Sequence, residues 1–349
     1  MKRSTIGDVA AAAGVSVATV SRVLNGGNVK EATASRVWEV VTRLEYTPNA
    51  LTKSIFAGRS STIGAVIDDL SSPFYLDLMR GIDEVAAANG SLVTFSSTFR
   101  HGDREIAQVQ TMDEQRVRGL VVTTGTSTDD KTRRMAAGGT PCVIVARSVP
   151  NPPPRLHSVS LDHIAAGWMM AEHLISCGRR RIGVISSGTR PSQFGRIEGL
   201  RSGLDEAGLS LPEEAVVDVA TKSEVGEAVW ALLERSKTLD ALVCLTGRYT
   251  VAVHSALADC GLAIPDDIGF LSMDDFSWGP ALGITVVAQP SYQMGRRAAE
   301  LIVGNSNQSA QLTFEPKLVV RTSCGESSAF RTSKLPSSSH RPALPSTPS

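Results

Sequence analysis

The segment from Val17 to Asn25 combines small side chains with one arginine and one asparagine, a set that could contact nucleic acid. Apolar residues at helical spacing define an inward face of this segment. The opposite face carries Val17, Ala18, Ser21, Arg22 and Asn25. An arginine there can donate two hydrogen bonds to guanine, whereas asparagine and hydroxyl groups can bind phosphates or base edges. The expected chemistry is base recognition in the major groove of DNA, although an ordinary helical hairpin would show the same spacing.

Two short helices joined by a tight turn are expected to position this face. Thr5 can cap the first helix together with Asp8, three residues later. Gly14 can end that helix in the left-handed conformation, and Ser16 can cap the second helix at once. A third helix, from Glu31 to Leu44, can cover the first two with its apolar residues Val37, Trp38, Val40, Val41 and Leu44.

The run from Thr5 to Val66 closely resembles the N-terminus of the lactose-repressor/galactose-repressor family of bacterial transcription factors. The resemblance is carried by AGVSVATVSRVLN, by the step from Tyr46 to Ala50 and by the hinge that ends at Gly58-Arg59, and it continues more loosely to about Glu326. It implies an all-α helix-turn-helix domain at residues 1–47 and a hinge helix or linker at residues 48–61. The candidate DNA-binding residues are Thr5, Ser16, Val17, Ala18, Thr19, Ser21, Arg22, Asn25, Tyr46, Asn49, Lys53 and Ile55.

The hinge segment begins after Pro48, which ends the third helix, and Asn49 can cap a single helical turn there. In the resembled family this hinge helix pairs with that of the dimer mate in the minor groove, where a leucine wedges into the central base step. Ile55 occupies the wedge position in this chain, and Lys53 the adjacent one. An apolar wedge flanked by cations suits the minor groove. Packing of Ile55 onto the body below is the alternative interpretation.

From Ser61 onward, apolar strands alternate with amphipathic helices, the pattern of parallel sheets covered on both faces. Ten strand-like segments are too many for one compact sheet, so we predict two α/β lobes within residues 62–325. Lobe 1 takes about 62–161 and 290–320, and lobe 2 about 162–289. The Ser/Pro-rich tail, 326–349, is expected to be disordered. The predicted helices include Phe74–Ala88, Arg104–Gln115, Ala165–Cys177, Arg196–Ala207, Val225–Arg235 and Thr250–Cys260.

The resemblance implies that these lobes form an effector-binding domain shaped like a periplasmic sugar-binding protein. In such sheets ligands bind beyond the carboxyl ends of the strands. The candidate effector-binding residues at these ends are Ser72, Phe74, Tyr75, Arg147, Phe194, Arg196, Thr246, Asp274, Trp278 and Gln289.

Several of these strand ends depart from the resembled family. Arg196 and Asp274 align with its ligand-gripping residues, but Ala146 replaces an acidic residue. Thr246-Gly247 stand where relatives have Asn-Asp, and Arg248 adds a cation, unless it is a solvated surface arginine. We therefore expect an effector other than a simple neutral hexose, such as a sugar acid or a sugar phosphate.

Composition and charge agree with a two-part protein of 349 residues, of which 42% are apolar. The formal net charge is zero, but residues 1–59 hold eight Lys/Arg against four acids, so 8 − 4 = +4 on the head and −4 on the remainder. A basic head suits phosphate contact. Five cysteines without a CxxC motif fit a reducing cytosol. Neither an export segment nor a run of ~18 apolar residues is present, so we expect a cytoplasmic protein without membrane insertion.

The sequence predicts no catalytic residue, metal site or cofactor, because it has no phosphate-loop ending, GxSxG or HExxH. We interpret the chain as a transcription regulator, most commonly a repressor in the resembled family, that binds double-stranded DNA. The tail lacks a leucine heptad, so a homodimer on a pseudo-palindromic operator is expected. One alternative is a periplasmic-type solute-binding protein, which predicts an export signal and no basic head. Another is an α/β enzyme with an accessory N-terminal domain, which requires an acid, base or nucleophile set at the strand ends.

Overall fold

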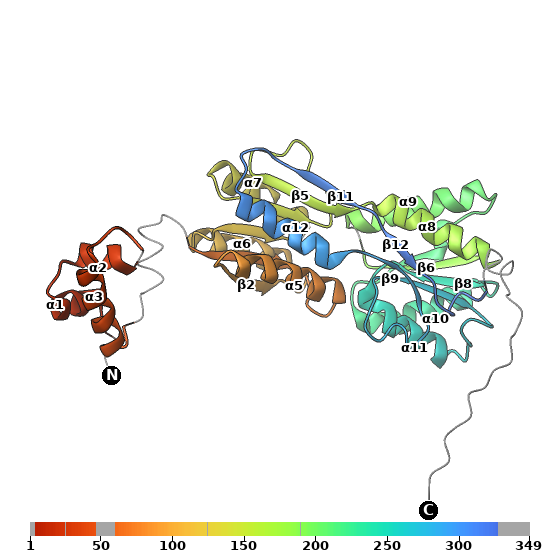
Figure 1. Cartoon of the computed structure of the whole chain (residues 1–349). Helices are drawn as coiled ribbons and strands as arrows, with labels where there is room; N and C mark the ends of the chain where they lie inside the picture. The colour runs from red at the N-terminus through yellow and green to blue at the C-terminus, as the bar shows by residue number, and fades with distance from the viewer. Residues whose placement is uncertain (1–3, 25, 47–59, 124, 189, 327–349) are drawn as a thin grey trace, which may run out of the picture.

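The computed structural model of the chain describes residues 4–24, 26–46, 60–123, 125–188 and 190–326 (Figure 1). An all-α head precedes an α/β body with two sheets, parallel except for the edge strand β12, which confirms the predicted fold class. The head contains α1 (Ile6–Ala13), α2 (Val17–Leu24) and α3 (Glu31–Arg43).

The turn between α1 and α2 forms as its residue types predict. The Thr5 side chain accepts a hydrogen bond from the Asp8 amide while the Asp8 carboxylate accepts one from the Thr5 amide. Gly14 ends α1 with φ of 64°, and the Ser16 hydroxyl accepts from the Thr19 amide at 3.2 Å. These caps satisfy helix-end groups that would otherwise lack partners. The two helices are bent by 104°, within the range of about 90–120° typical of DNA-binding helix-turn-helix motifs.

A small core of valines and alanines holds the three head helices together, with Val9, Val20 and Val37 fully buried. Trp38 was predicted to cover the first two helices, but its side chain is 49% exposed. Trp38 lies next to Val37 on α3, and one residue of helix turns the side chain by about 100°, away from the core. No single helix in the described ranges is long and apolar enough to cross a membrane; only the bent pair of α1 and α2 together passes that test.

The first lobe is built on a fully parallel sheet with the strand order β11-β5-β4-β3-β1-β2. Its strands are β1 (Thr62–Ile67), β2 (Leu92–Ser97), β3 (Gly119–Val122), β4 (Cys142–Val145), β5 (Leu156–Leu161) and β11 (Gln311–Phe314). Its helices are α5 (Pro73–Ala88), α6 (Gly102–Glu114), η1 (Thr126–Thr128), α7 (Asp129–Ala137) and α12 (Ser291–Gly304). One buried apolar cluster joins α5 and α12 to one face of the sheet, and a second joins α6 and α7 to the other.

The second lobe repeats this plan with the strand order β12-β10-β9-β8-β6-β7. Its strands are β6 (Ile182–Ser186), β7 (Val216–Asp218), β8 (Ala241–Cys244), β9 (Gly269–Met273), β10 (Thr285–Ala288) and β12 (Lys317–Val319). Its helices are α8 (His163–Ser176), α9 (Pro191–Glu206), η2 (Glu213–Ala215), η3 (Lys222–Glu224), α10 (Val225–Arg235), η4 (Gly247–Tyr249) and α11 (Thr250–Asp259). Helices α8 and α9 cover one face, and α10 and α11 cover the other.

The chain passes between the lobes three times, after β5, after β10 and after β11. The third passage was not predicted, because the sequence placed residues 290–320 wholly in the first lobe. In the structure β12 pairs antiparallel with β10 at the edge of the second sheet, so residues 317–319 belong to the second lobe. Antiparallel pairing needs no helical crossover, so a short connection after β11 is sufficient.

In each lobe one pair of helices packs backbone to backbone through glycine. A Cβ atom at Gly199 of α9 would lie 1.9 Å from the Ile164 carbonyl oxygen of α8. In the first lobe a Cβ at Gly295 of α12 would lie 2.0 Å from the Leu78 oxygen of α5. Only residues without a side chain allow this approach. Figure 1 shows α8 and α9 side by side, and the close packing fixes the helix ends that face the other lobe.

Candidate functional site

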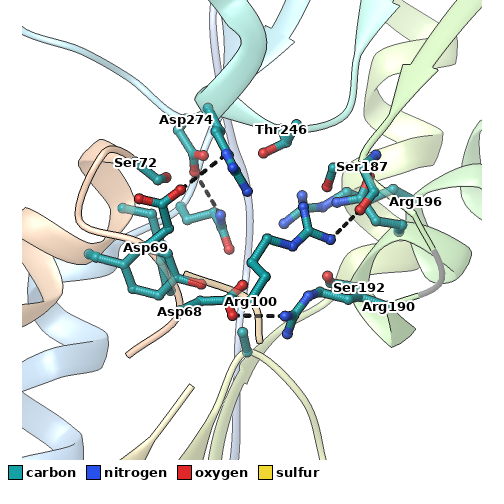
Figure 2. Close-up of a pocket in the computed structure, with 16 residues that line it drawn as sticks. Asp68, Asp69, Ser72, Arg100, Ser187, Arg190, Ser192, Arg196, Thr246 and Asp274 are labelled. Carbon is teal, nitrogen blue, oxygen red and sulfur yellow. Dashed lines mark hydrogen bonds and ion pairs between the residues drawn. The ribbon is translucent and has the colours of Figure 1, made fainter. Parts of the chain in front are cut away.

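A cleft between the two lobes brings together residues from both sheets (Figure 2). It borders about 570 Å³ of empty space, open solvent at its mouth included. The first lobe contributes Asp68, Asp69, Ser72, Phe74, Tyr75, Arg100 and Ala146. The second contributes Ser187, Arg190, Ser192, Gln193, Arg196, Thr246, Arg248 and Asp274, and Gln289 lies on the passage between β10 and α12.

The topology of the sheets accounts for this convergence. Asp68 directly follows β1, Ser187 follows β6, and Asp274 follows β9. The carboxyl ends of parallel strands meet at one edge of a sheet. In this fold those edges of the two sheets face each other, so residues far apart in the sequence line a single cleft.

Two arginines of the second lobe form ion pairs with acidic residues of the first lobe across the cleft. The Arg190 Nη2 atom lies 2.7 Å from Asp68 Oδ1 and 3.8 Å from Glu105 Oε1. The Arg248 Nε atom lies 3.1 Å from Asp69 Oδ2. Burial raises the pKa of Asp68, and the positive charge of Arg190 opposes that rise. Arginine and aspartate from opposite lobes therefore hold the cleft together (Figure 2).

The inner wall of the cleft carries two buried charged residues, Arg196 and Asp274. Asp274 Oδ1 accepts from Gln289 Nε2 at 2.6 Å, and Oδ2 accepts from the Gly247 amide at 3.2 Å. The Arg196 guanidinium donates to the Leu245 carbonyl at 2.7 Å. Burial raises the pKa of Asp274 and lowers that of Arg196, and each charge opposes the shift of the other.

Gly247 explains one departure from the resembled family. A Cβ atom there would lie 2.6 Å from Asp274 Oδ2 and 2.8 Å from the Phe276 ring. Glycine therefore lets the backbone amide approach the Asp274 carboxylate, which a larger residue at this position would displace.

Aromatic rings close one side of the cleft. Phe74 and Tyr75, in the first turn of α5, are edge to face with centroids 5.1 Å apart. Burial, chiefly, raises the pKa of the Tyr75 phenol, so the ring is neutral at ordinary pH. Such a wall can stack on a ligand ring.

Most of the candidate effector-binding residues lie in this cleft: Ser72, Phe74, Tyr75, Arg196, Thr246, Asp274 and Gln289. Arg147 does not. Ala146 has φ of 71°, which turns the chain so that Ala146 faces the cleft while Arg147 pairs with Asp129 and donates to the Gly125 carbonyl at 3.0 Å. Arg147 therefore lies outside the cleft lining in this structure, and its contact with the effector remains a prediction.

Phe194 and Trp278 also lie outside the cleft lining. Gln193 and Arg196 are three residues apart and share the cleft face of α9, whereas Phe194 points away and is 55% exposed. Trp278 stacks on Phe276, with centroids 4.2 Å apart, and packs against the core of the second lobe. The structure therefore places both residues outside the cleft lining, and their contact with the effector remains a prediction.

Sequence reasoning missed several residues of the cleft: Asp68, Asp69, Arg100, Ser187, Arg190, Ser192 and Gln193. The strand-end rule could have found Asp68, Asp69 and Ser187, because they directly follow β1 and β6. Arg100 gives no such signal, since it lies on the loop after β2 with φ of 66°.

The outward face of α2 exposes several of the candidate DNA-binding side chains. Val17 is 47% exposed, and Ala18 and Arg22 are exposed as well. Thr5 and Ser16 are exposed at the helix caps, while Thr19 and Ser21 are half-buried.

Four of the candidate DNA-binding residues lie outside the described part of the chain: Asn25, Asn49, Lys53 and Ile55. Tyr46 was expected on the DNA surface, but its ring is buried in the head core. Apolar packing of that ring explains the difference, and we withdraw its assignment to DNA contact.

Within the described ranges, no cluster of three or more His, Cys, Asp or Glu residues could hold a metal ion. His163 lies beside the cleft, where its Nε2 is 3.0 Å from the Ala146 carbonyl oxygen. Burial, with a contribution from Arg196, lowers the pKa of His163 to about 3, so the imidazole is neutral.

Two family models match this chain. "Bacterial regulatory proteins, lacI family" matches residues 5–49, and "Periplasmic binding proteins and sugar binding domain of LacI family" matches residues 60–314. The chain is 30% identical over 333 residues to the HTH-type transcriptional regulator DegA of Bacillus subtilis, covering 92% of this chain and 98% of DegA. It is 30% identical over 311 residues to the catabolite control protein A of Priestia megaterium, covering 87% and 93%.

Solved structures of transcription regulators have a similar fold. A complex of the transcriptional regulator CelR with cellobiose superposes with a TM-score of 0.68 at 27% identity, covering 92% of this chain and 100% of CelR. The lac repressor dimer bound to operator and the anti-inducer ONPF superposes with a TM-score of 0.78, covering 93% of this chain and 100% of the repressor chain. At 22% identity, the second likeness shows the fold alone.

Proposed function

This chain belongs to the LacI family of bacterial regulatory proteins, and from that premise we propose that α2 reads operator DNA under the control of a small molecule bound between the lobes. The chain is a DNA-binding transcriptional regulator with an effector-binding body. What remains to be assigned is which groups read the DNA, where the effector binds and how the two are coupled.

The observation that carries the DNA assignment is the exposed face of α2 on a rigidly capped scaffold. Arg22 lies in the last turn of α2 and projects into solvent. The buried valines on the opposite side of α2 leave its outer face available to a groove. An arginine so placed can bind guanine through two N–H groups, and small neighbours allow close approach to the bases.

The effector is assigned to the cleft because its polar groups come from both lobes. A ligand that bonds Asp274 of the second lobe and Asp68 of the first stabilises one degree of closure over others. A change of closure alters the positions of the two DNA-binding heads in an assembly. Operator and effector affinities then change each other by the same factor. The match to the lacI-family regulatory model supports DNA as a partner of this chain, and the relative named for its cellobiose complex supports a sugar-like molecule.

A second copy of the chain is the proposed partner of the free edge of the first sheet. Leu92 and Phe95 on the edge strand β2 are 75% and 50% exposed, and Leu76 on the adjacent α5 is also exposed. Large apolar groups on an edge strand favour association with another chain. A two-fold dimer predicts a pseudo-palindromic operator. Because operator DNA lies in the cytoplasm, we propose that this regulator acts there and that it has no catalytic role.

Operator selection tests the proposal directly. The full-length protein is used to select binding sequences from a random duplex pool, and affinities are measured by fluorescence anisotropy at fixed salt. We expect the selected duplex to be preferred over random duplex by at least about 10³-fold and to carry two related half-sites. Equal affinity for both duplexes would contradict the proposal.

A further inference from the structure

The cleft is lined by four arginines and three aspartates, and two of the arginines already have carboxylate partners. Arg190 pairs with Asp68 and also approaches Glu105, and Arg248 pairs with Asp69. Arg248, which the sequence presented as an added cation, is therefore neutralised by the opposite lobe. Any preference of the cleft for an anion must come from its other arginines.

Arg100 and Arg196 are those arginines. Among the described residues, neither has a carboxylate oxygen within the 4.0 Å of an ion pair. Arg100 Nη2 donates to the Ser187 carbonyl at 2.5 Å, and Arg196 Nη1 donates to the Leu245 carbonyl at 2.7 Å. Each guanidinium carries five N–H donors, so most of them remain available.

The surroundings of Arg196 favour an incoming negative charge. Its side chain is 95% buried, and its Nε is a buried donor without a partner in the described chain. The carboxylate of Asp274 lies close enough to interact with it, but it is hydrogen-bonded to Gln289 and Gly247. An incompletely paired buried guanidinium is costly, and a ligand anion that meets it forms charge-assisted hydrogen bonds in a medium of low dielectric.

Arg100 reaches the same cleft from the opposite lobe. It lies on the loop after β2, and its guanidinium crosses to the backbone of Ser187 in the second lobe (Figure 2). The positive charge of Arg100 opposes the rise that burial causes in the pKa of Asp68, but the carboxylate of Asp68 forms its ion pair with Arg190. The two lobes therefore each present one guanidinium whose hydrogen-bond partners are neutral carbonyls.

We propose that the effector is a polyhydroxylated acid whose carboxylate or phosphate binds Arg100 and Arg196, with its hydroxyl groups on Asp274 and Gln289. This inference rests on the proposed function, since it names the ligand class of the same cleft. Gln289 Oε1 is a buried acceptor without a partner in the described chain, and it suits a sugar hydroxyl. Because one anion joins arginines of both lobes, its binding favours the closed cleft.

The experiment compares acids with their neutral parents on the full-length protein. Thermal shift and calorimetry are run with D-gluconate, D-glucuronate, D-galacturonate and glucose 6-phosphate, each beside glucose or galactose, with sodium chloride to match ionic strength. We expect at least one acid to raise the melting temperature and to bind about 10- to 100-fold more tightly than its neutral parent. Comparing the affinity for glucose 6-phosphate with the affinities for the sugar acids shows whether the cleft prefers a phosphate or a carboxylate group.

The variant Arg100→Gln assigns the anion to its site. We expect it to weaken binding of the acid by about 10- to 100-fold and to weaken binding of the neutral sugar less, because only the acid loses a charge-assisted contact. Arg235→Gln is the matched control, because Arg235 is exposed outside the cleft and also donates to a backbone carbonyl, that of Glu214 at 3.0 Å. It should bind the acid like the parent protein.

Three results would overturn the inference: a neutral sugar that binds as tightly as its acid, no shift with any acid of the panel at millimolar concentration, or an unchanged acid affinity in Arg100→Gln. Operator selection is carried out on the same preparation. Specific DNA binding together with any of these results would leave the regulator intact and reject only the acidic effector.

Discussion

The close contact of α8 with α9 predicts a large effect of adding one methyl group. In Gly199→Ala the new Cβ would lie 1.9 Å from the Ile164 oxygen and 2.9 Å from the Trp168 nitrogen. Ordinary Cβ contacts begin at 3.4 Å, so α8 and α9 must separate by about 3.4 − 1.9 = 1.5 Å. Both obstacles are backbone atoms of a helix, which cannot rotate out of the way.

The free energy of unfolding can be worked from these contacts. Overpacking costs about 1–3 kcal/mol. Because the atoms that the new methyl group meets belong to the rigid backbone of the facing helix, we expect a cost of about 3 kcal/mol at this site. Alanine recovers about 1 kcal/mol of helix propensity over glycine. The net loss is about 2 kcal/mol, which lowers the melting temperature by about 3 °C in a chain of 349 residues. Because Arg196 lies one turn away on α9, affinity for the effector should fall as well.

Differential scanning calorimetry of the full-length protein measures this loss, and Gly226→Ala supplies the control. Gly226 lies in the first turn of α10, where a Cβ would meet nothing within 4 Å. The same substitution should therefore stabilise the chain there, by at most about 1 kcal/mol. If Gly199→Ala melts at or above the temperature of Gly226→Ala, the packing argument is wrong.

Three further predictions concern the head, the cleft and pH. Arg22→Ala should weaken operator binding by about 1–3 kcal/mol and relax selectivity at one base pair, which anisotropy with single-base operator variants measures. Asp274→Ala should abolish the effect of the effector on operator affinity while effector-free DNA binding stays near the parent value; an unchanged response would refute our placement of the site. His163 has a pKa of about 3 in the folded chain and about 6.5 when unfolded. The unfolded state therefore binds more protons below pH 6.5, and the free energy of unfolding decreases as the pH is lowered. From pH 6.5 to 5 the loss is about 2 kcal/mol, and His163→Gln, followed by urea unfolding at both pH values, should remove that part of the slope.

The head could be predicted from the sequence because its signals are local. The caps at Thr5 and Ser16 and the left-handed Gly14 involve residues no more than a few positions apart. Trp38 and Tyr46 were misplaced because their exposure depends on how α3 rotates against α1 and α2, which no local pattern encodes.

The cleft could be predicted only in part. Strand ends located Asp274 and Thr246, but the rotation of Ala146 and Arg147 depends on one positive φ. The pairing of Arg248 with Asp69 joins segments about 180 residues apart in different lobes, so the sequence showed a cation without showing its partner. The strands β11 and β12 escaped prediction because they are short edge strands with alternating polar residues.

The third passage of the chain between the lobes limits how the body can move. A single covalent link would let one half swivel freely about the other. The three connections that follow β5, β10 and β11 run between the same two lobes. Twisting one lobe against the other would stretch some of these connections and compress others, whereas bending the lobes toward each other strains all three little. We therefore expect a bound small molecule to change mainly how far the two lobes are open, and not how they are twisted. A change confined to this one motion can be passed from the cleft to the rest of the molecule.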